Sequence, residues 1–104
     1  MTEKEKMIAG QLYDPLDPVL CADRVKAREL CLRLNQAPES DTALRRQLLD
    51  ELLGYQSDVW MQPPFYCDYG TNIRLGRKVF FNFTCVVLDV TTVTIGNHTL
   101  FGPA

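Results

Sequence analysis

The chain has 104 residues, enough for one domain with a modest core, and its 46% hydrophobic and 23% charged residues are typical of a folded globular protein. Its formal net charge is −2 and its Lys and Arg residues form no cluster. This argues against a nucleic-acid or anionic-membrane partner, since both need concentrated positive charge. No apolar run approaches the roughly 20 residues of a membrane span, and the polar N-terminus leads into no signal-peptide core, so we expect a cytoplasmic protein.

Charged residues divide the chain into two parts of different character. Residues 1–62 hold eleven acids and eight bases, whereas residues 63–104 hold only two acids and three bases. The pattern of the first part predicts helices and that of the second predicts strands. We therefore expect an α+β chain with a helical head over residues 1–55, a link with a first strand over 56–68, and a β part over 69–104.

Three helices are expected in the head. A short first helix spans about residues 2–12, and the prolines of residues 14–18 then predict a turn, because proline breaks a helix and extends the residue before it. The second helix spans about residues 22–35 and carries one apolar stripe at helical spacing. The third begins after a cap at residues 41–42 and ends at Gly54, a residue well suited to a helix C-terminus.

The β part repeats every six residues. Large apolar residues stand six apart and, after two extra residues, resume that spacing: Tyr69, Leu75, Phe81 and Val87, then Ile95 and Phe101. A period of six fits neither a helix, which repeats at 3.6, nor a strand, which repeats at 2. It fits a three-sided coil with one inward residue per side, so that residues 69–104 make about two turns of three sixes. The interruption at residues 90–92 is expected to bulge as a corner loop.

Residues that could hold a metal are few and scattered. The four cysteines contain no Cys-x-x-Cys pair and there is one histidine, His98, so we expect no zinc site. The cysteines are expected to be free thiols that pack as small apolar groups. His98 stands at a repeat position usually filled by a polar turn residue, which indicates an exposed corner residue rather than a catalytic base.

Three segments, residues 3–13, 63–73 and 81–89, resemble the sugar O-acetyltransferases. The similarity is to the maltose, galactoside and nodulation acetyltransferases among the hexapeptide-repeat acyltransferases. It implies a helical head followed by the first coils of a left-handed parallel β-helix. It also implies transfer of an acetyl group from acetyl-CoA to a hydroxyl of maltose, glucose or a galactoside, without a metal. Enzymes of this family are homotrimers with active sites between neighbouring β-helices, where a histidine deprotonates the acceptor hydroxyl.

The resemblance stops short of the family's general base. In the family, the catalytic histidine follows shortly after the segment that matches residues 100–104, and the chain ends there. Most family contacts to coenzyme A lie in later coils. The last repeat is incomplete, and an uncapped coil exposes unpaired strand edges. We therefore expect a fragment or truncated form of a longer protein, poorly stable and inactive by itself.

Four residues match substrate-binding positions of the family. Asn82 matches an asparagine near the acetyl group and the catalytic histidine, where an amide can hold a reacting oxygen without titrating. Asp68 and Asp89 match residues near the sugar acceptor, whose hydroxyls can donate to a carboxylate. Asp17, or Asp14 in its place, matches an acidic residue that reaches a neighbouring site, with Arg24 as a companion. Structural interpretations stay open for all five, namely turn residues, a solvated strand residue and a helix-surface arginine.

Two other functions compete with the sugar acetyltransferase. The chain could be a non-catalytic, truncated subunit that assembles with a full-length relative and contributes part of its sites. It could also be a different enzyme on the same coil, such as a zinc-dependent β-helix, but that chemistry needs several histidines. The presence of a single histidine argues against the zinc enzyme.

Overall fold

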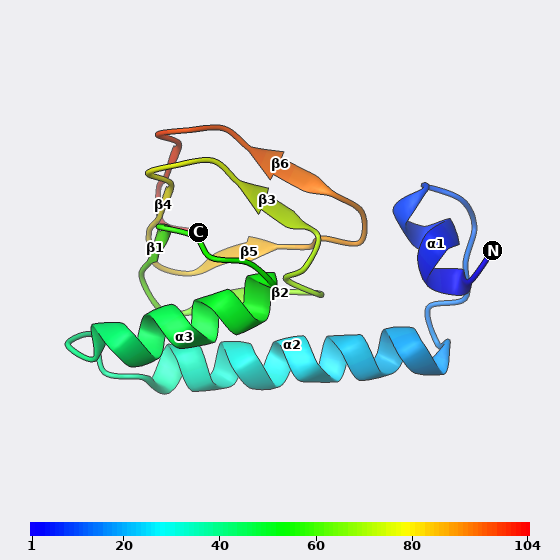
Figure 1. The fold of residues 1–104 in the computed structure, drawn as a ribbon, viewed down its shortest axis with the longest axis horizontal. Coiled ribbons are helices and arrows are strands. Elements are labelled where there is room, and N and C mark those ends of the chain that lie inside the picture. The colour runs from blue at the N-terminus through cyan, green and yellow to red at the C-terminus, as the bar shows by residue number, and fades with distance from the viewer.

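The computed structural model describes all 104 residues as a helical head that lies against one end of a three-sided β coil (Figure 1). The helices are α1 (Glu3–Ile8), α2 (Pro18–Gln36) and α3 (Thr42–Leu53). The strands are β1 (Trp60–Met61), β2 (Phe65–Cys67), β3 (Ile73–Leu75), β4 (Phe80–Phe81), β5 (Cys85–Val87), β6 (Val93–Ile95) and β7 (Leu100–Phe101). None of the helices is both long and apolar enough to cross a membrane.

Capping residues set the helix boundaries and explain two differences from the predicted ones. The first helix ends at Ile8, earlier than predicted, and Gly10 follows in a left-handed conformation. The second begins four residues earlier than predicted, because the Asp17 carboxylate accepts the N–H groups of the first turn and Pro18 occupies the first helical position. Proline fits there since that position needs no N–H donor. The third has the predicted cap at Asp41 and ends at Gly54.

The strands wind as a parallel coil with twenty residues per turn. Trp60 lies opposite Phe80, and Phe80 lies opposite Leu100, each pair twenty positions apart. The other two sides, β2–β5 and β3–β6, keep the same offset. The expected turn of three sixes is therefore wrong by two residues. The coil also starts at β1, before residue 69, where the repeat pattern was read to begin.

The two additional residues lie in one long corner, which occurs in both turns. Residues 68–72 join β2 to β3, and residues 88–92 join β5 to β6. Cys67, rather than Tyr69, is therefore the inward residue of its side, because it lies opposite Val87. Tyr69 stands in the long corner and packs in a separate small cluster with two residues of the head. Within one turn, consecutive inward residues are thus six positions apart across each short corner and eight apart across the long corner.

The short corners repeat a left-handed backbone conformation. Lys78 and His98, twenty residues apart, both have φ of 59°. Thr84 and Ala104, also twenty apart, have φ of 60° and 58°. Such values are uncommon for residues with a Cβ, so their recurrence marks them as corner positions of the coil. His98 is exposed at its corner, as expected from the sequence.

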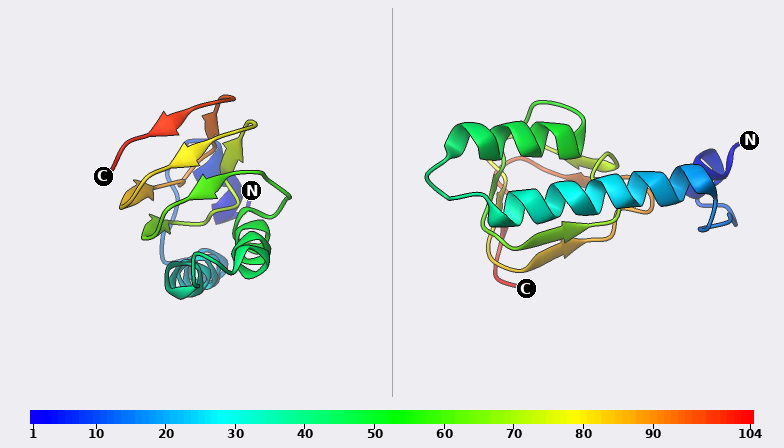
Figure 2. Two further views of the ribbon diagram at one scale, coloured as in Figure 1. Left: turned by 90° about the vertical axis from the view of Figure 1, so that its left-hand side faces the viewer. Right: turned by 90° about the horizontal axis from the view of Figure 1, so that it is seen from below.

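The head covers the first turn of the coil and completes its core (Figure 2). The apolar stripes of α2 and α3 join the inward residues of the coil in one cluster of 17 buried side chains. Arg45 is buried in this contact and donates to the carbonyls of Leu34 and Met61, with its guanidinium 6.0 Å from the Trp60 ring centre. The arginine therefore joins α2, α3 and β1 where backbone carbonyls would otherwise lack donors.

Candidate functional site

A buried carboxylate organises the long corner of the coil. Asp89 is 0% exposed, and its Oδ1 accepts the N–H groups of Asp68 at 3.1 Å and Tyr69 at 2.9 Å. Its Oδ2 accepts the N–H of Asn72 at 3.2 Å, and the Asn72 amide donates to the Asp89 carbonyl at 2.9 Å. One carboxylate from the second turn thus holds three backbone donors of the first turn. These bonds fix the backbone of Asp68 and therefore the position from which its side chain extends.

The structure places Asp89 inside the corner rather than on its surface. Asp89 was predicted to contact the sugar acceptor, but its oxygens point into the corner and are closed off from solvent. A buried carboxylate with three N–H donors is well satisfied and has no exposed surface to offer a ligand. In this structure Asp89 fixes the backbone of Asp68, Tyr69 and Asn72.

Asp68 and Arg24 are both found near this corner, where Tyr69 follows Asp68 in the chain and binds Arg24. Asp68 is half-buried, and its carboxylate makes no hydrogen bond within the chain. Arg24 reaches from α2 and donates to the Tyr69 hydroxyl at 2.7 Å and to the Pro15 carbonyl at 2.6 Å. The bond to the Tyr69 hydroxyl, and more weakly the nearby Asp68 carboxylate, raise the pKa of the Arg24 guanidinium. The corner therefore carries a carboxylate without a hydrogen bond, and the Tyr69 hydroxyl holds a guanidinium near the same corner.

Asp17 lies apart from this corner, at the N-terminus of α2. Its Oδ2 accepts the N–H groups of Val19 at 3.1 Å and Leu20 at 3.3 Å, which makes it a helix cap. The residue is half-buried beside a cavity formed with the first residues of the chain. The sequence had suggested a turn residue at this position, and the structure shows a helix cap instead. The second carboxylate oxygen makes no hydrogen bond within the chain.

Asn82 stands at the opposite end of β5 from Asp89. It follows β4 at a short corner, is half-buried, and its Oδ1 accepts the N–H of Phe83 at 2.8 Å. Its own N–H donates to the Phe101 carbonyl at 3.0 Å. The side-chain NH₂ makes no hydrogen bond within the chain. The structure thus brings Asp68, Asp89 and Arg24 together and leaves Asn82 at the other end of the β2–β5 side.

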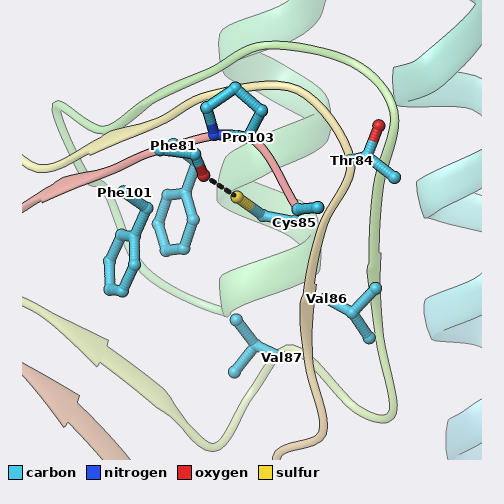
Figure 3. Close-up of a pocket in the computed structure, with 9 residues that line it drawn as sticks. Phe81, Thr84, Cys85, Val86, Val87, Phe101 and Pro103 are labelled. Carbon is cyan, nitrogen blue, oxygen red and sulfur yellow. Dashed lines mark hydrogen bonds between the residues drawn. The ribbon is translucent and has the colours of Figure 1, made fainter.

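A largely apolar cavity of about 540 Å³ lies next to the Asn82 corner and was not predicted from the sequence (Figure 3). Phe81 and Phe101 stack at one side with ring centres 4.6 Å apart, and the Cys85 thiol donates to the Gly102 carbonyl at 3.6 Å. Val86 and Val87 line it from β5. The cavity lies at the end of the coil away from the head, where β5 and β7 each pair with a strand on one side only. The recurrence of phenylalanine at 81 and 101 was the only sequence signal for it.

The side chains do not suggest a metal centre. No group of three or more His, Cys, Asp or Glu residues converges as metal ligands would. All four cysteines are free, as predicted, and three of them are buried. The site therefore consists of carboxylates, one amide and one guanidinium, which are groups that bind neutral polyols and carbonyl oxygens.

Known proteins share this sequence and architecture. The family model described as the maltose acetyltransferase hexapeptide capping motif matches residues 6–55, which are the helical head. Nodulation protein L of Rhizobium meliloti is 42% identical over 104 residues, which are 99% of this chain and 57% of that protein. The chain therefore spans about half the length of the curated relatives it matches.

Solved structures match nearly the whole chain. A maltose O-acetyltransferase from Clostridium difficile 630 superposes with a TM-score of 0.94 at 34% identity, covering 99% of this chain and 56% of that one. A hexapeptide-repeat acetyltransferase from Vibrio cholerae O1 biovar eltor, complexed with acetyl coenzyme A, superposes with a TM-score of 0.86 at 39% identity. The match covers 99% of this chain and 56% of that one. These matches confirm the predicted fold of a helical head and the first coils of a left-handed parallel β-helix. The chain belongs to the maltose and galactoside O-acetyltransferase subfamily of the hexapeptide-repeat acyltransferases.

Proposed function

We propose that this chain is part of a cytoplasmic O-acetyltransferase that moves an acetyl group from acetyl-CoA to a hydroxyl of maltose, glucose or a galactoside. The observation that carries the proposal is the superposition of 99% of the chain on a maltose O-acetyltransferase with a TM-score of 0.94. Head, coil and corners correspond as one unit, so the likeness extends beyond the repeats that many acyltransferases share. The acetyl coenzyme A complex of the Vibrio cholerae relative supports acetyl-CoA as the co-substrate.

The Asp68 corner is the proposed acceptor side. A sugar hydroxyl both donates and accepts, so it can donate to the free Asp68 carboxylate and accept from the Arg24 guanidinium. Asp89 keeps this pair in place through the backbone bonds of the corner. Asp17, with one unbonded carboxylate oxygen, is proposed to reach the acceptor at a neighbouring site. Carboxylate and guanidinium together favour a neutral polyol over a charged acceptor.

Asn82 is the proposed contact to the reacting acetyl group. Its free NH₂ can donate to a carbonyl oxygen that gains negative charge when the sugar oxygen attacks. A general base must take the proton of the sugar hydroxyl, and the sulfur of coenzyme A leaves as the acyl bond breaks. His98 is unsuited as that base, because it is an exposed corner residue at φ 59°. We propose that the base comes from outside these 104 residues and that the isolated chain does not turn over.

The outer face of the β2–β5 side supports a homotrimer as the active form. Tyr66 and Val86 lie opposite each other on this face, and both are exposed. Phe83 and Leu88, at the two ends of β5, extend the exposed apolar surface. Contiguous apolar surface of this kind marks a protein interface. A neighbouring β-helix on this face would lie between the Asn82 and Asp68 corners, where a shared active site needs it.

A non-catalytic subunit is the second candidate. Such a chain would enter trimers of a full-length relative and contribute its Asp68 corner without a base. It predicts mixed trimers on co-expression, whereas the enzyme proposal predicts activity once the remaining coils are supplied.

A chimera tests the proposal. Residues 1–104 are joined to the remaining coils of the Clostridium difficile protein, and release of free coenzyme A is measured with and without maltose. We expect sugar-dependent release, and we expect Asp68→Asn to lower kcat/KM by about tenfold or more, equivalent to about 1.4 kcal/mol of lost transition-state binding. The matched control is Asp58→Asn, an exposed corner carboxylate that accepts the N–H of Lys78. A folded chimera that binds acetyl-CoA but ignores every sugar, or equal effects of the two variants, would overturn the proposal.

A further inference from the structure

Two buried thiols face each other where the head meets the coil. Cys31, in the C-terminal half of α2, and Cys67, the last residue of β2, have their Sγ atoms 3.8 Å apart. The two residues are 2% and 5% exposed and lie 36 positions apart in the chain. The other two thiols have different neighbours, since Cys21 lies near the Pro15 carbonyl and Cys85 near that of Gly102.

The two thiols differ in how readily they lose a proton. A hydrogen bond from the Cys67 thiol lowers the pKa of Cys31, because a donor stabilises the thiolate. The same bond and burial raise the pKa of Cys67, which therefore keeps its proton. In a pair of neighbouring thiols, the one that ionises first can react with an oxidant, and the other can then attack its sulfur.

The backbone around the pair is already aligned for a covalent link. Asn35, one helical turn after Cys31, donates from its amide to the Phe65 carbonyl at 3.1 Å and accepts the Phe65 N–H at 2.9 Å. Phe65 precedes Cys67 by two residues on the same inward face of β2. These bonds hold α2 against β2 in one register. Closing the sulfur atoms to the bonding distance of about 2.05 Å requires an approach of less than about 2 Å.

We propose that Cys31 and Cys67 form an oxidation-sensitive dithiol that closes to a disulfide on reaction with a hydroperoxide, fastening α2 to the first turn of the coil. The Cys31 thiolate attacks one peroxide oxygen, the O–O bond breaks, and Cys31 becomes a sulfenic acid while hydroxide leaves. Hydroxide takes the proton of the Cys67 thiol to give water. The Cys67 thiolate then attacks the Cys31 sulfur, and hydroxide departs. Two thiols are oxidised to one disulfide, and the peroxide is reduced to water.

Hydrogen peroxide suits this buried site because it is about as small as water. A larger oxidant such as glutathione disulfide would first need α2 to separate from β2. The disulfide would close a loop of 36 residues that contains α3 and β1. Linking a loop of that length restricts the unfolded chain, so the oxidised protein should melt roughly 15 °C higher than the reduced protein.

The test treats the reduced, folded chain with hydrogen peroxide, alkylates the remaining thiols and maps the peptides by mass spectrometry. We expect one disulfide, between the peptides of Cys31 and Cys67, with Cys21 and Cys85 alkylated and the Tm raised. Cys85→Ser, which alters another buried thiol, should form the same disulfide. Cys31→Ser should form none and show no rise in Tm. Four alkylated thiols, a different disulfide, or Cys31 and Cys67 oxidised separately to sulfinic acids would overturn the proposal. The mapping of the wild-type chain decides the matter even if a serine variant does not fold.

Discussion

Replacing Asp89 by alanine should destabilise the long corner of the coil and lower the free energy of unfolding. The variant would leave three backbone N–H groups without acceptors, those of Asp68, Tyr69 and Asn72. Each unpaired buried donor costs about 1–3 kcal/mol, and entering water can relieve part of this. We therefore expect a loss of roughly 4 kcal/mol, a large share of the 5–15 kcal/mol that small domains have.

Urea unfolding followed by circular dichroism measures this loss. With a slope near 1–3 kcal/mol per molar urea, the Asp89→Ala midpoint should fall by roughly 2 M. Asp89→Asn keeps one acceptor oxygen and should lose about half as much. Asp58→Ala is the matched control, because Asp58 also accepts a backbone N–H across one turn of the coil but is exposed, so it should cost about 1 kcal/mol or less. An Asp89→Ala midpoint as close to wild type as that of Asp58→Ala would refute this reasoning.

Three substitutions and a change of pH test other parts of the fold. Gly70→Ala should cost roughly 3 kcal/mol or more, since φ is 79° and a Cβ would lie 2.5 Å from a backbone oxygen. Gly10→Ala, at φ 76° in open space, should cost about 1 kcal/mol, and equal losses in thermal unfolding would contradict the packing argument. Arg45→Met should cost roughly 2–4 kcal/mol, because two buried carbonyls lose their donor, and a urea midpoint equal to wild type would be inconsistent with this. The hydrogen bond from the Thr2 N–H lowers the pKa of Glu5 in the folded chain below its ordinary 4.5. The capping box of α1 should therefore be intact above pH 4.5, and it should be lost as the pH falls through the lower pKa of the folded chain. Amide protection of α1, corrected for intrinsic exchange, should fall over that range, and constant protection would argue against the cap.

Much of the fold could be predicted because it depends on local patterns. The apolar stripes, the Asp41 cap and the Gly54 stop are short-range signals, and the structure contains all three. The size of the turn was predicted wrongly, because Tyr69 has the same chemistry as an inward residue but packs on the head instead. Only the pairing of β2 with β5 shows that Cys67 is the inward residue.

The sequence could not show how the predicted site residues are arranged. Asp68, Asp89 and Arg24 were all selected from the sequence, and they do lie together. Nothing local shows that the Asp89 carboxylate turns inward, because its three donors are 17 to 21 positions away in the chain. The Cys31–Cys67 contact is equally non-local, since the thiols meet only after the head docks on the coil. Long-range contacts of this kind leave no periodic pattern.

Sugar-dependent release of coenzyme A by the protein expressed from its native gene tests the central claim most directly. Free thiol is measured after mixing the protein with acetyl-CoA, alone and with maltose, glucose or a galactoside. The proposed function predicts that at least one sugar accelerates release and that Asp68→Asn removes most of that acceleration. A folded protein that binds no acetyl-CoA, or that releases coenzyme A at one rate with and without every sugar, would contradict it.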